Sequence, residues 1–234
     1  MIDVLWLAGT FNPQGEGISD DFLKRLDPKR FRYRYVTDGY FADYGKVVSY
    51  AESARLGELA LDRAVRECRG AVVVGGYSQG AAIAGNYAAN WADPRQVLGC
   101  ALIADPLRDG SQPTVNPNPG GYGIGGQRRI HSVKTLTVAA WGDPITSLPA
   151  GNYLRSIADF SEFMGRDVNA WAVNVLSKIV KGQLQPWWRW SNRRDWAEAG
   201  RWLRGYTTDS RHTAAYVTEG LTRQLADAVN EEIR

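Results

Sequence analysis

The chain has 234 residues, of which 44% are hydrophobic and 23% are charged. This length and composition are typical of one large globular domain, and they exclude a disordered or fibrous protein. The formal net charge of +3 is too small to predict a nucleic-acid partner unless the basic residues cluster.

The amino-terminal residues form a short apolar run over positions 2–8, and no basic segment precedes it. Such a run favours a buried first strand over a cleavable signal peptide. No segment reaches the about 20 consecutive apolar residues that a membrane-spanning helix needs. We therefore expect a protein that is made in the cytoplasm without a signal peptide or a transmembrane segment. If it acts outside the cell, another process must release it.

Apolar patterns predict alternating strands and helices along the first two-thirds of the chain. The predicted strands cover 2–8, the more exposed 31–36, 71–75, 97–104 and 135–140. The predicted helices cover 19–26, with Ser19 as the cap, then 50–68, 81–91 and finally 213–233. Repeated strand–helix units predict an α/β fold with a mostly parallel sheet and helices on both faces.

Two segments interrupt this alternation. Residues 106–130 contain four prolines and a glycine-rich run, and so long a loop in a compact domain is usually functional or mobile, for example as a lid. Residues 152–204 look helical and contain six tryptophans, which either contact lipid or sugar or form the packed core of the helices. We interpret residues 1–234 as a single domain in which 152–204 is a helical, tryptophan-rich insertion.

The segment Gly76-Tyr77-Ser78-Gln79-Gly80 is a G-x-S-x-G motif between a predicted strand and a predicted helix rich in small residues. In this context the serine lies on a strained turn that lifts its hydroxyl above the carboxyl edge of the sheet. Small glycines on either side let neighbouring backbone pass closely. The sequence therefore predicts Ser78 as a nucleophile, with the N–H of Gln79 as an oxyanion donor at the start of the helix.

A nucleophilic serine needs a base, and the only histidines are His131 and His212. His131 directly precedes a predicted strand, so it lies at the amino edge of the sheet. A strand of about seven residues separates the two edges by roughly 23 Å. His212 lies in the loop that opens the final helix, where this kind of fold places its base. We therefore predict His212 as the base and His131 as a surface residue.

Two aspartates are candidates for the carboxylate that orients the base. Asp105 and Asp143 each end a predicted strand and each precede a proline, which also starts many turns. The usual chain order, with the acid two strands after the nucleophile strand, favours Asp143. Asp105 remains the alternative, with a structural role if Asp143 is the acid.

A second oxyanion donor is expected from the loop after the first strand, where the N–H of Thr10 is a candidate and an ordinary tight turn is the alternative. The two cysteines, Cys68 and Cys100, are expected to be reduced thiols, although they could also lie close enough to pair. Two cysteines and two histidines at these spacings do not form a zinc site, so we predict no metal.

Four segments together resemble the mycobacteriophage lysin B family, whose members are cutinase-like α/β hydrolases. They are the elbow at 76–81, Gly9-Thr10, Trp141-Gly142-Asp143-Pro144 and Arg211-His212-Thr213. Asp143 and His212 are 69 positions apart, and the predicted insertion lies between them. Ordinary cutinases keep these two residues much closer, so the insertion is the more discriminating feature.

The resemblance implies a cutinase-like α/β-hydrolase fold in which Ser78 is the nucleophile, Asp143 the acid and His212 the base. It also implies hydrolysis of the ester between mycolic acids and arabinogalactan, at the envelope of the host after phage-induced lysis. No cofactor is needed, and we expect a monomer that acts on a lipid ester at the cell-envelope surface. No peptidoglycan-binding extension is evident before the first strand, so binding to the wall would rely on the catalytic domain.

Two alternatives remain open at this point. A general cutinase, lipase-like carboxylesterase or acyltransferase would carry the same three residues, because the triad does not select the acyl group. A non-catalytic module that binds the envelope could also retain the motif without using it.

Overall fold

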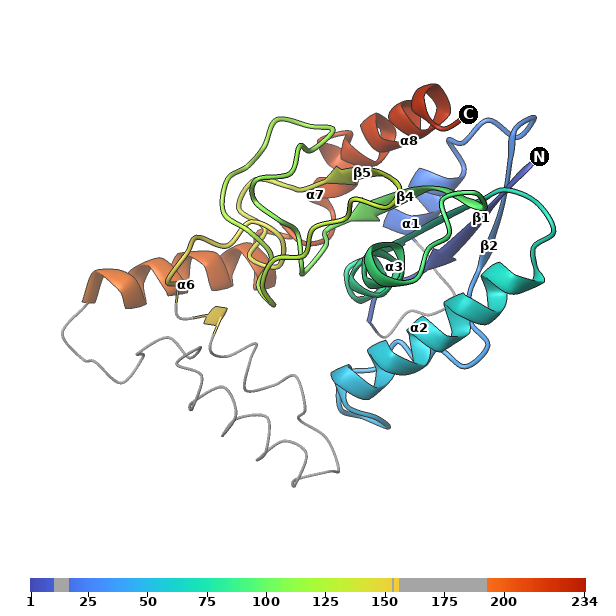
Figure 1. Ribbon diagram of the computed structural model, residues 1–234. Coiled ribbons are helices and arrows are strands. Elements are labelled where there is room, and N and C mark those ends of the chain that lie inside the picture. The colour runs from blue at the N-terminus through green and yellow to red at the C-terminus, as the bar shows by residue number, and fades with distance from the viewer. Residues whose placement is uncertain (11–16, 153, 156–192) are drawn as a thin grey trace.

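The computed structural model describes residues 1–10, 17–152, 154–155 and 193–234 of the protein. Its centre is a sheet of five parallel strands in the order β2-β1-β3-β4-β5 (Figure 1). The strands are β1 (Ile2–Leu7), β2 (Phe31–Tyr35), β3 (Val72–Tyr77), β4 (Val97–Ile103) and β5 (Lys134–Val138). The predicted α/β fold with a parallel sheet is confirmed.

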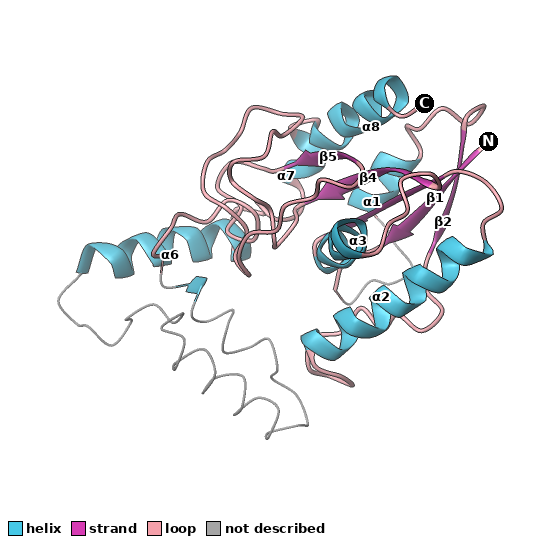
Figure 2. Ribbon diagram, in the orientation of Figure 1, coloured by secondary structure: helices cyan, strands magenta, loops and turns pink. Residues whose placement is uncertain are grey.

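Helices cover both faces of this sheet, as the alternating layers in Figure 2 show. The helices α2 (Tyr50–Glu67) and α3 (Gln79–Asn90) pack on one face. The helices α1 (Ile18–Leu23), α7 (Ala215–Thr218) and α8 (Leu221–Glu232) pack on the other. The helix α6 (Arg193–Thr207) lies beyond the carboxyl ends of the strands.

The alternation of side chains along the strands explains the two layers. In β1, Leu5 and Leu7 belong to the apolar cluster under α2 and α3, whereas Val4 and Trp6 belong to the cluster under α1 and α8. Successive residues of a strand point to opposite faces, so a strand buried on both faces reads as a continuous apolar run. The edge strand β2 is largely exposed, as its alternating sequence predicted.

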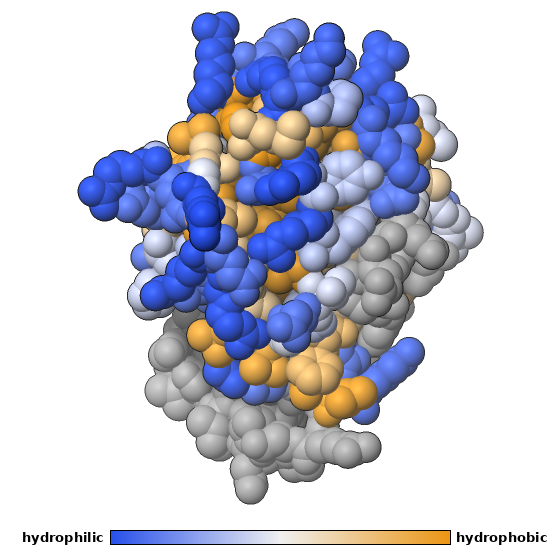
Figure 3. Space-filling model, turned by 90° about the vertical axis from the view of Figure 1, so that its right-hand side faces the viewer, coloured by the Kyte–Doolittle hydropathy of each residue, from blue (hydrophilic) through white to orange (hydrophobic). Residues whose placement is uncertain are grey.

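The amino edge of the sheet is polar. Figure 3 shows the face that carries both chain ends, and hydrophilic side chains cover most of it. Two hollows on this edge have mixed linings, with Arg30, Glu231 and Arg234 in one, and Asp3, Arg32 and Glu67 in the other. Because β1 begins beside both hollows, they lie at the opposite edge of the sheet from Ser78.

Several predicted helix boundaries differ from those of the structure, and at two of them the backbone conformation gives the reason. The first helix begins at Ile18, after Gly17 with a φ of 62°, so Ser19 is not its cap but a buried residue of its first turn. The final helix is not continuous over 213–233, because Gly220 has a φ of 71° and separates α7 from α8. A left-handed backbone conformation interrupts a right-handed helix, and glycine adopts it without a steric penalty.

The long segment 106–130 contains no helix or regular strand, but it is packed into the molecule. Arg108 is buried and donates hydrogen bonds to the carbonyl oxygens of Thr146 at 2.7 Å and Gly121 at 3.0 Å. Arg128 joins the same segment to α3 through the carbonyl of Ala82 at 3.1 Å. These guanidinium groups form hydrogen bonds with backbone carbonyls of the segment itself and of the elements around it, which holds the segment in place.

Most of the predicted insertion, including 156–192 and four of its six tryptophans, lies outside the described residues. Its final part is helical as α6, and Trp202 packs there against an apolar cluster of Leu148, Leu154 and Ala199. Among the helices described, none is both long and apolar enough to cross a membrane. Cys68 and Cys100 are free thiols, as expected.

Candidate active site

Ser78 lies between the end of β3 and the start of α3, with a φ of 55° and a ψ of −118°. A residue with a side chain rarely adopts this conformation, so the surrounding structure must hold it. The glycines of the motif allow that packing. A Cβ atom on Gly76 would lie 2.4 Å from the carbonyl oxygen of Gly80, and one on Gly80 would lie 2.0 Å from that of Leu7. The two glycines therefore let the helix start against both its own strand and β1.

The hydroxyl of Ser78 meets the imidazole of His212. The distance from Ser78 Oγ to His212 Nε2 is 2.9 Å, although the two residues are 134 positions apart. His212 is buried in the turn between α6 and α7, and its backbone carbonyl accepts a hydrogen bond of 2.6 Å from the hydroxyl of Tyr77. The rings of Tyr77 and Tyr206 each stack on the imidazole at 5.4 Å between centroids. The hydrogen bond from Tyr77 thus fixes the backbone of His212, and the two stacked tyrosine rings fix its imidazole.

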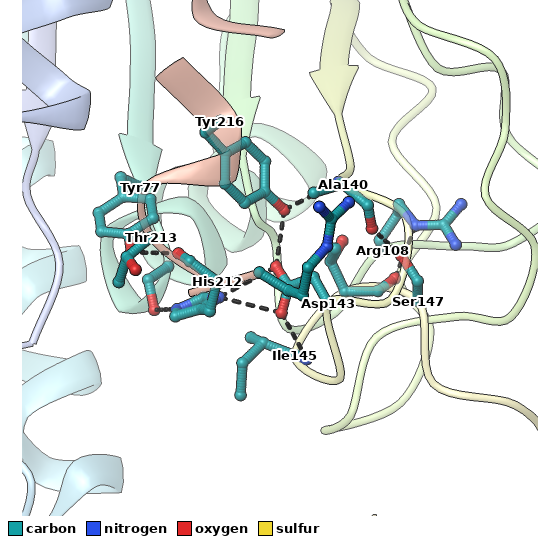
Figure 4. Close-up of polar contacts among 12 residues, drawn as sticks. Tyr77, Arg108, Ala140, Asp143, Ile145, Ser147, His212, Thr213 and Tyr216 are labelled. Carbon is teal, nitrogen blue, oxygen red and sulfur yellow. Dashed lines mark hydrogen bonds and ion pairs between the residues drawn. The ribbon is translucent and has the colours of Figure 1, made fainter. Parts of the chain in front are cut away.

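The other side of the imidazole meets Asp143. His212 Nδ1 lies 3.1 Å from Oδ1 and 3.0 Å from Oδ2 of this fully buried carboxylate, as Figure 4 shows. An ionised carboxylate only accepts hydrogen bonds, so Nδ1 carries the proton and Nε2 is free to accept one from Ser78. The N–H of Ile145 also donates to Oδ1 at 2.9 Å. These donors fix the orientation of the Asp143 carboxylate.

Tyr216 is a further partner of Asp143 that the sequence analysis missed. Its hydroxyl donates to Asp143 Oδ2 at 2.7 Å and accepts a hydrogen bond from the N–H of Ala140 at 3.1 Å (Figure 4). Burial, with the nearby charge of Asp143, raises the pKa of Tyr216 well above its ordinary value, so the hydroxyl keeps its proton. No local pattern in the sequence pointed to this contact, because Tyr216 and Asp143 are 73 positions apart.

Asp105 has different partners from Asp143. Its carboxylate lies 2.6 Å from the guanidinium of Arg128 and accepts the N–H of Leu107 at 2.9 Å. Burial raises the pKa of Asp105 above its ordinary value, and the charge of Arg128 acts in the opposite direction. The structure therefore joins His212 to Asp143 and assigns Asp105 to a buried ion pair. His131 is exposed just before β5, on the amino side of that strand.

The two predicted oxyanion donors lie on neighbouring elements beside Ser78. Gln79 is the first residue of α3, where backbone N–H groups have no acceptor within the helix. The loop that carries Thr10 follows β1, which pairs with β3 up to Leu7 and Gly76. A Cβ atom on Gly9 would lie 3.5 Å from Ser78 Cβ, so this loop passes directly beside the nucleophile elbow. The carboxyl edge of the sheet thus brings all five predicted site residues into one region.

This arrangement provides a hydroxyl with a base at hydrogen-bond distance and a carboxylate that orients the base. Such a set can activate an alcohol for attack on a carbonyl carbon. Among the described residues, no group of histidine, cysteine, aspartate or glutamate side chains is arranged to hold a metal ion. The contact of the Ser78 hydroxyl with His212 points to nucleophilic chemistry at Ser78.

The comparisons with known proteins address the fold. No protein-family profile and no curated protein sequence matches the chain. A cutinase-like protein from Cryptococcus sp. has a TM-score of 0.50 and 18% identity, over 91% of this chain and 94% of that one. An acetylxylan esterase has a TM-score of 0.49 and 22% identity over 64% and 86%. A cutinase of Trichoderma reesei, in complex with a phosphonate inhibitor, has a TM-score of 0.33 and 21% identity over 58% and 59%.

The parallel five-stranded sheet, the helices on both faces and the serine elbow define an α/β-hydrolase fold. The likeness to the Cryptococcus protein extends over nearly the whole of both chains. The fold of this protein is therefore that of a cutinase-like α/β hydrolase, as the sequence predicted.

Proposed function

We propose that this protein is a serine carboxylic-ester hydrolase. The observation that carries the proposal is the continuous connection Ser78–His212–Asp143, with 2.9 Å and 3.0 Å between the interacting atoms. A non-catalytic module would have no reason to keep a serine at a φ of 55° in hydrogen-bond contact with a buried, doubly stacked histidine.

In this reaction, His212 Nε2 takes the proton of Ser78 Oγ as the oxygen attacks the carbonyl carbon of the ester. The N–H groups of Gln79 and Thr10 bind the oxyanion of the tetrahedral intermediate. His212 then gives its proton to the departing alcohol, which leaves an acyl group on Ser78. Water attacks this acyl-enzyme, again with His212 as the base. The bond between Ser78 Oγ and the acyl carbon then breaks, His212 returns the proton to Oγ, and the carboxylic acid is released. Asp143 stays ionised throughout and stabilises the imidazolium.

We further propose a long-chain lipid ester as the substrate, namely the ester between mycolic acids and arabinogalactan. The resemblance of the motifs to the lysin B family suggests this substrate, together with action at the host envelope after phage-induced lysis. Exposed aromatic side chains beside the site support an apolar acyl group. Trp141, two residues before Asp143, is 69% exposed, and Tyr206, which stacks on His212, is 49% exposed. Aromatic rings of this kind offer a large apolar surface to a bound chain.

A fluorophosphonate probe tests the reaction type. We expect the wild-type protein to be labelled at Ser78, because attack on phosphorus uses the same activated hydroxyl. Ser78→Ala should remove the label, and His212→Ala should slow it by at least about 1000-fold, because the base is lost. His131→Ala is the matched control and should label at the wild-type rate. Labelling that survives in His212→Ala would contradict the proposed base.

The substrate needs a separate assay. Purified mycolyl-arabinogalactan should release free mycolic acid with the wild-type protein and not with Ser78→Ala. Hydrolysis of short p-nitrophenyl esters without any release of mycolate would identify a general carboxylesterase. Formation of a new ester when an alcohol competes with water would identify an acyltransferase. A protein that binds the envelope, hydrolyses none of these esters and does not react with the fluorophosphonate probe would be a binding module.

A further inference from the structure

A buried set of polar side chains lies behind the nucleophile elbow and takes no part in the triad. The side chain of Gln79 is completely buried. Its amide nitrogen donates to the carbonyl oxygen of Asp43 at 3.0 Å. Its amide oxygen accepts a hydrogen bond from the hydroxyl of Ser53 at 3.4 Å and lies 3.2 Å from the hydroxyl of Tyr40. The hydrogen bonds of its side chain therefore fix the position of Gln79, whose backbone N–H is the first proposed oxyanion donor.

The hydroxyl of Tyr40 also reaches the loop that carries the second donor. It lies 2.9 Å from the carbonyl oxygen of Ala8, two residues before Thr10, and its one proton is shared between this carbonyl and the amide oxygen of Gln79. The same carbonyl lies against the elbow, because a Cβ atom on Gly80 would be 2.7 Å from it. The carbonyl of Ala8 is thus held between the start of α3 and Tyr40.

The far end of this network is also fixed. The buried carboxylate of Asp43 accepts the backbone N–H groups of Tyr44 at 2.8 Å and Val48 at 2.7 Å, and the N–H of Asp43 donates to Ser53 at 3.0 Å. These bonds hold the turn after β2 against the start of α2. The carbonyl of Asp43 that receives the Gln79 amide therefore has a defined position.

We propose that Tyr40 is a positioning residue for the oxyanion-binding groups, because its hydroxyl joins the loop after β1 to the side chain of Gln79. This inference rests on the proposed esterase activity. Oxyanion donors act only when they lie about 2.7–3.1 Å from the developing charge, and a displacement of about 1 Å can cost on the order of 100-fold in rate. Tyr40 lies in the buried layer behind the elbow and acts through the two donors rather than on the ester.

The hydroxyl is suited to this task because it stays protonated. Burial raises the pKa of Tyr40 well above its ordinary value, so the group stays neutral and keeps its proton. A neutral hydroxyl can donate to a carbonyl without bringing a second charge near the oxyanion. Ser53 supports the same amide oxygen from α2, and its contact is the longer of the two.

Tyr40→Phe removes the hydroxyl and keeps the ring. On a short p-nitrophenyl ester we expect kcat to fall about tenfold with KM within twofold of wild type, because only the charged intermediate needs the aligned donors. The rate of fluorophosphonate labelling should fall by a similar factor. Ser53→Ala should show the same pattern with a smaller loss, about threefold, and it provides a second test if Tyr40→Phe folds poorly.

Tyr35→Phe is the matched control, because its hydroxyl bonds to Asp20 at 2.8 Å, in contact with α1 rather than the elbow. Its kinetics should equal those of the wild type. Folded Tyr40→Phe and Ser53→Ala proteins that keep their kcat, or that change only KM, would overturn the inference and leave the esterase intact. An equal loss of kcat in Tyr35→Phe would also overturn the inference, because removal of any tyrosine hydroxyl would then lower kcat, whether or not it contacts the elbow. A wild-type protein that neither hydrolyses esters nor reacts with the probe would remove the proposed function itself, and this inference with it.

Discussion

Asp143 and Asp105 each follow a parallel strand and precede a proline, and their partners separate their roles. Asp143 receives the imidazole of His212, the hydroxyl of Tyr216 and a backbone N–H. Asp105 pairs with Arg128, which in turn contacts α3. A carboxylate with several neutral donors can respond to a charge that forms on the base, whereas one paired with a permanent cation is already neutralised.

Substitution by asparagine should separate the two aspartates. Asp143→Asn should lower kcat on a p-nitrophenyl ester by about 10,000-fold, because an amide can hold the imidazole in the wrong tautomer. Asp105→Asn should keep kcat within threefold per folded molecule. It should lose about 3–5 kcal/mol of unfolding free energy, because the buried charge of Arg128 loses its partner. Steady-state kinetics and urea denaturation measure the two effects, and the reverse pattern would assign the acid to Asp105.

At the scale of elements, the nucleophile elbow depends on how closely α3 approaches β1. Gly80, in the first turn of α3, has no room for a Cβ atom, because the carbonyl carbon and oxygen of Leu7 would lie within 2.5 Å of it. Moving the helix away would displace the N–H of Gln79 and change the backbone of Ser78. The small residues at the start of α3 are therefore a requirement of contact between two elements, in addition to the local turn.

Gly80→Ala tests this contact. Overpacking of this kind costs about 1–3 kcal/mol of unfolding free energy, and we expect esterase activity to fall at least as strongly because the elbow must shift. Gly70→Ala is the control, since no atom lies within 4 Å of a Cβ atom built there. It should change stability by no more than about 0.5 kcal/mol. Thermal unfolding and kcat of the two variants give the comparison, and a fully active Gly80→Ala protein would show that the approach of α3 to β1 is not needed.

The helix α6 connects the predicted insertion to the site. Its Tyr206 stacks on His212, and the N–H of Arg211 donates to the carbonyl of Gly205 at 2.9 Å. A Cβ atom on Gly205 would lie 2.7 Å from the carbonyl of Gly142, next to Asp143. The end of α6, just after the predicted insertion, therefore contacts both the base and the turn that carries the acid, so α6 is part of the wall of the site.

At the scale of the whole molecule, the sheet is enclosed between two helical layers, and Cys100 reports on that enclosure. It lies in β4 and is buried under α3. Burial raises the pKa of Cys100 to about 12. A thiol reacts as the thiolate, so below about pH 12 the folded protein keeps this group in its unreactive, protonated form.

Alkylation with iodoacetamide at pH 8 should therefore leave Cys100 unmodified while the protein is folded. In urea the cysteine becomes exposed, its pKa returns towards the ordinary value of about 8.5, and alkylation should be complete. A Cys68→Ser variant isolates the signal, and mass spectrometry measures it. Rapid alkylation of Cys100 in the native protein would mean that the layer formed by α3 opens far more easily than its packing suggests.

The elements were predictable where burial and local pattern agree. The runs in β1, β3 and β4 are apolar because both faces are covered, and the motif around Ser78 is recognisable because its residues are consecutive in the chain. The boundary errors at Ser19 and Gly220 have a different origin. Ser19 has the composition of a cap, but packing buries it within the first turn, and at Gly220 the backbone leaves the right-handed region.

The sequence alone determined the α/β class and the elbow at Ser78, and it reduced the possible bases to two histidines. These features follow from the order of residues along a few turns of chain. Tertiary structure decided which aspartate meets His212, and it supplied Tyr216, Tyr206 and Tyr40, which no local pattern singles out. The reason is physical. Strand order and helix packing set the distances between residues as far apart in the chain as Ser78 and His212. A hydrogen bond forms only between a donor and an acceptor that this packing brings within hydrogen-bond distance.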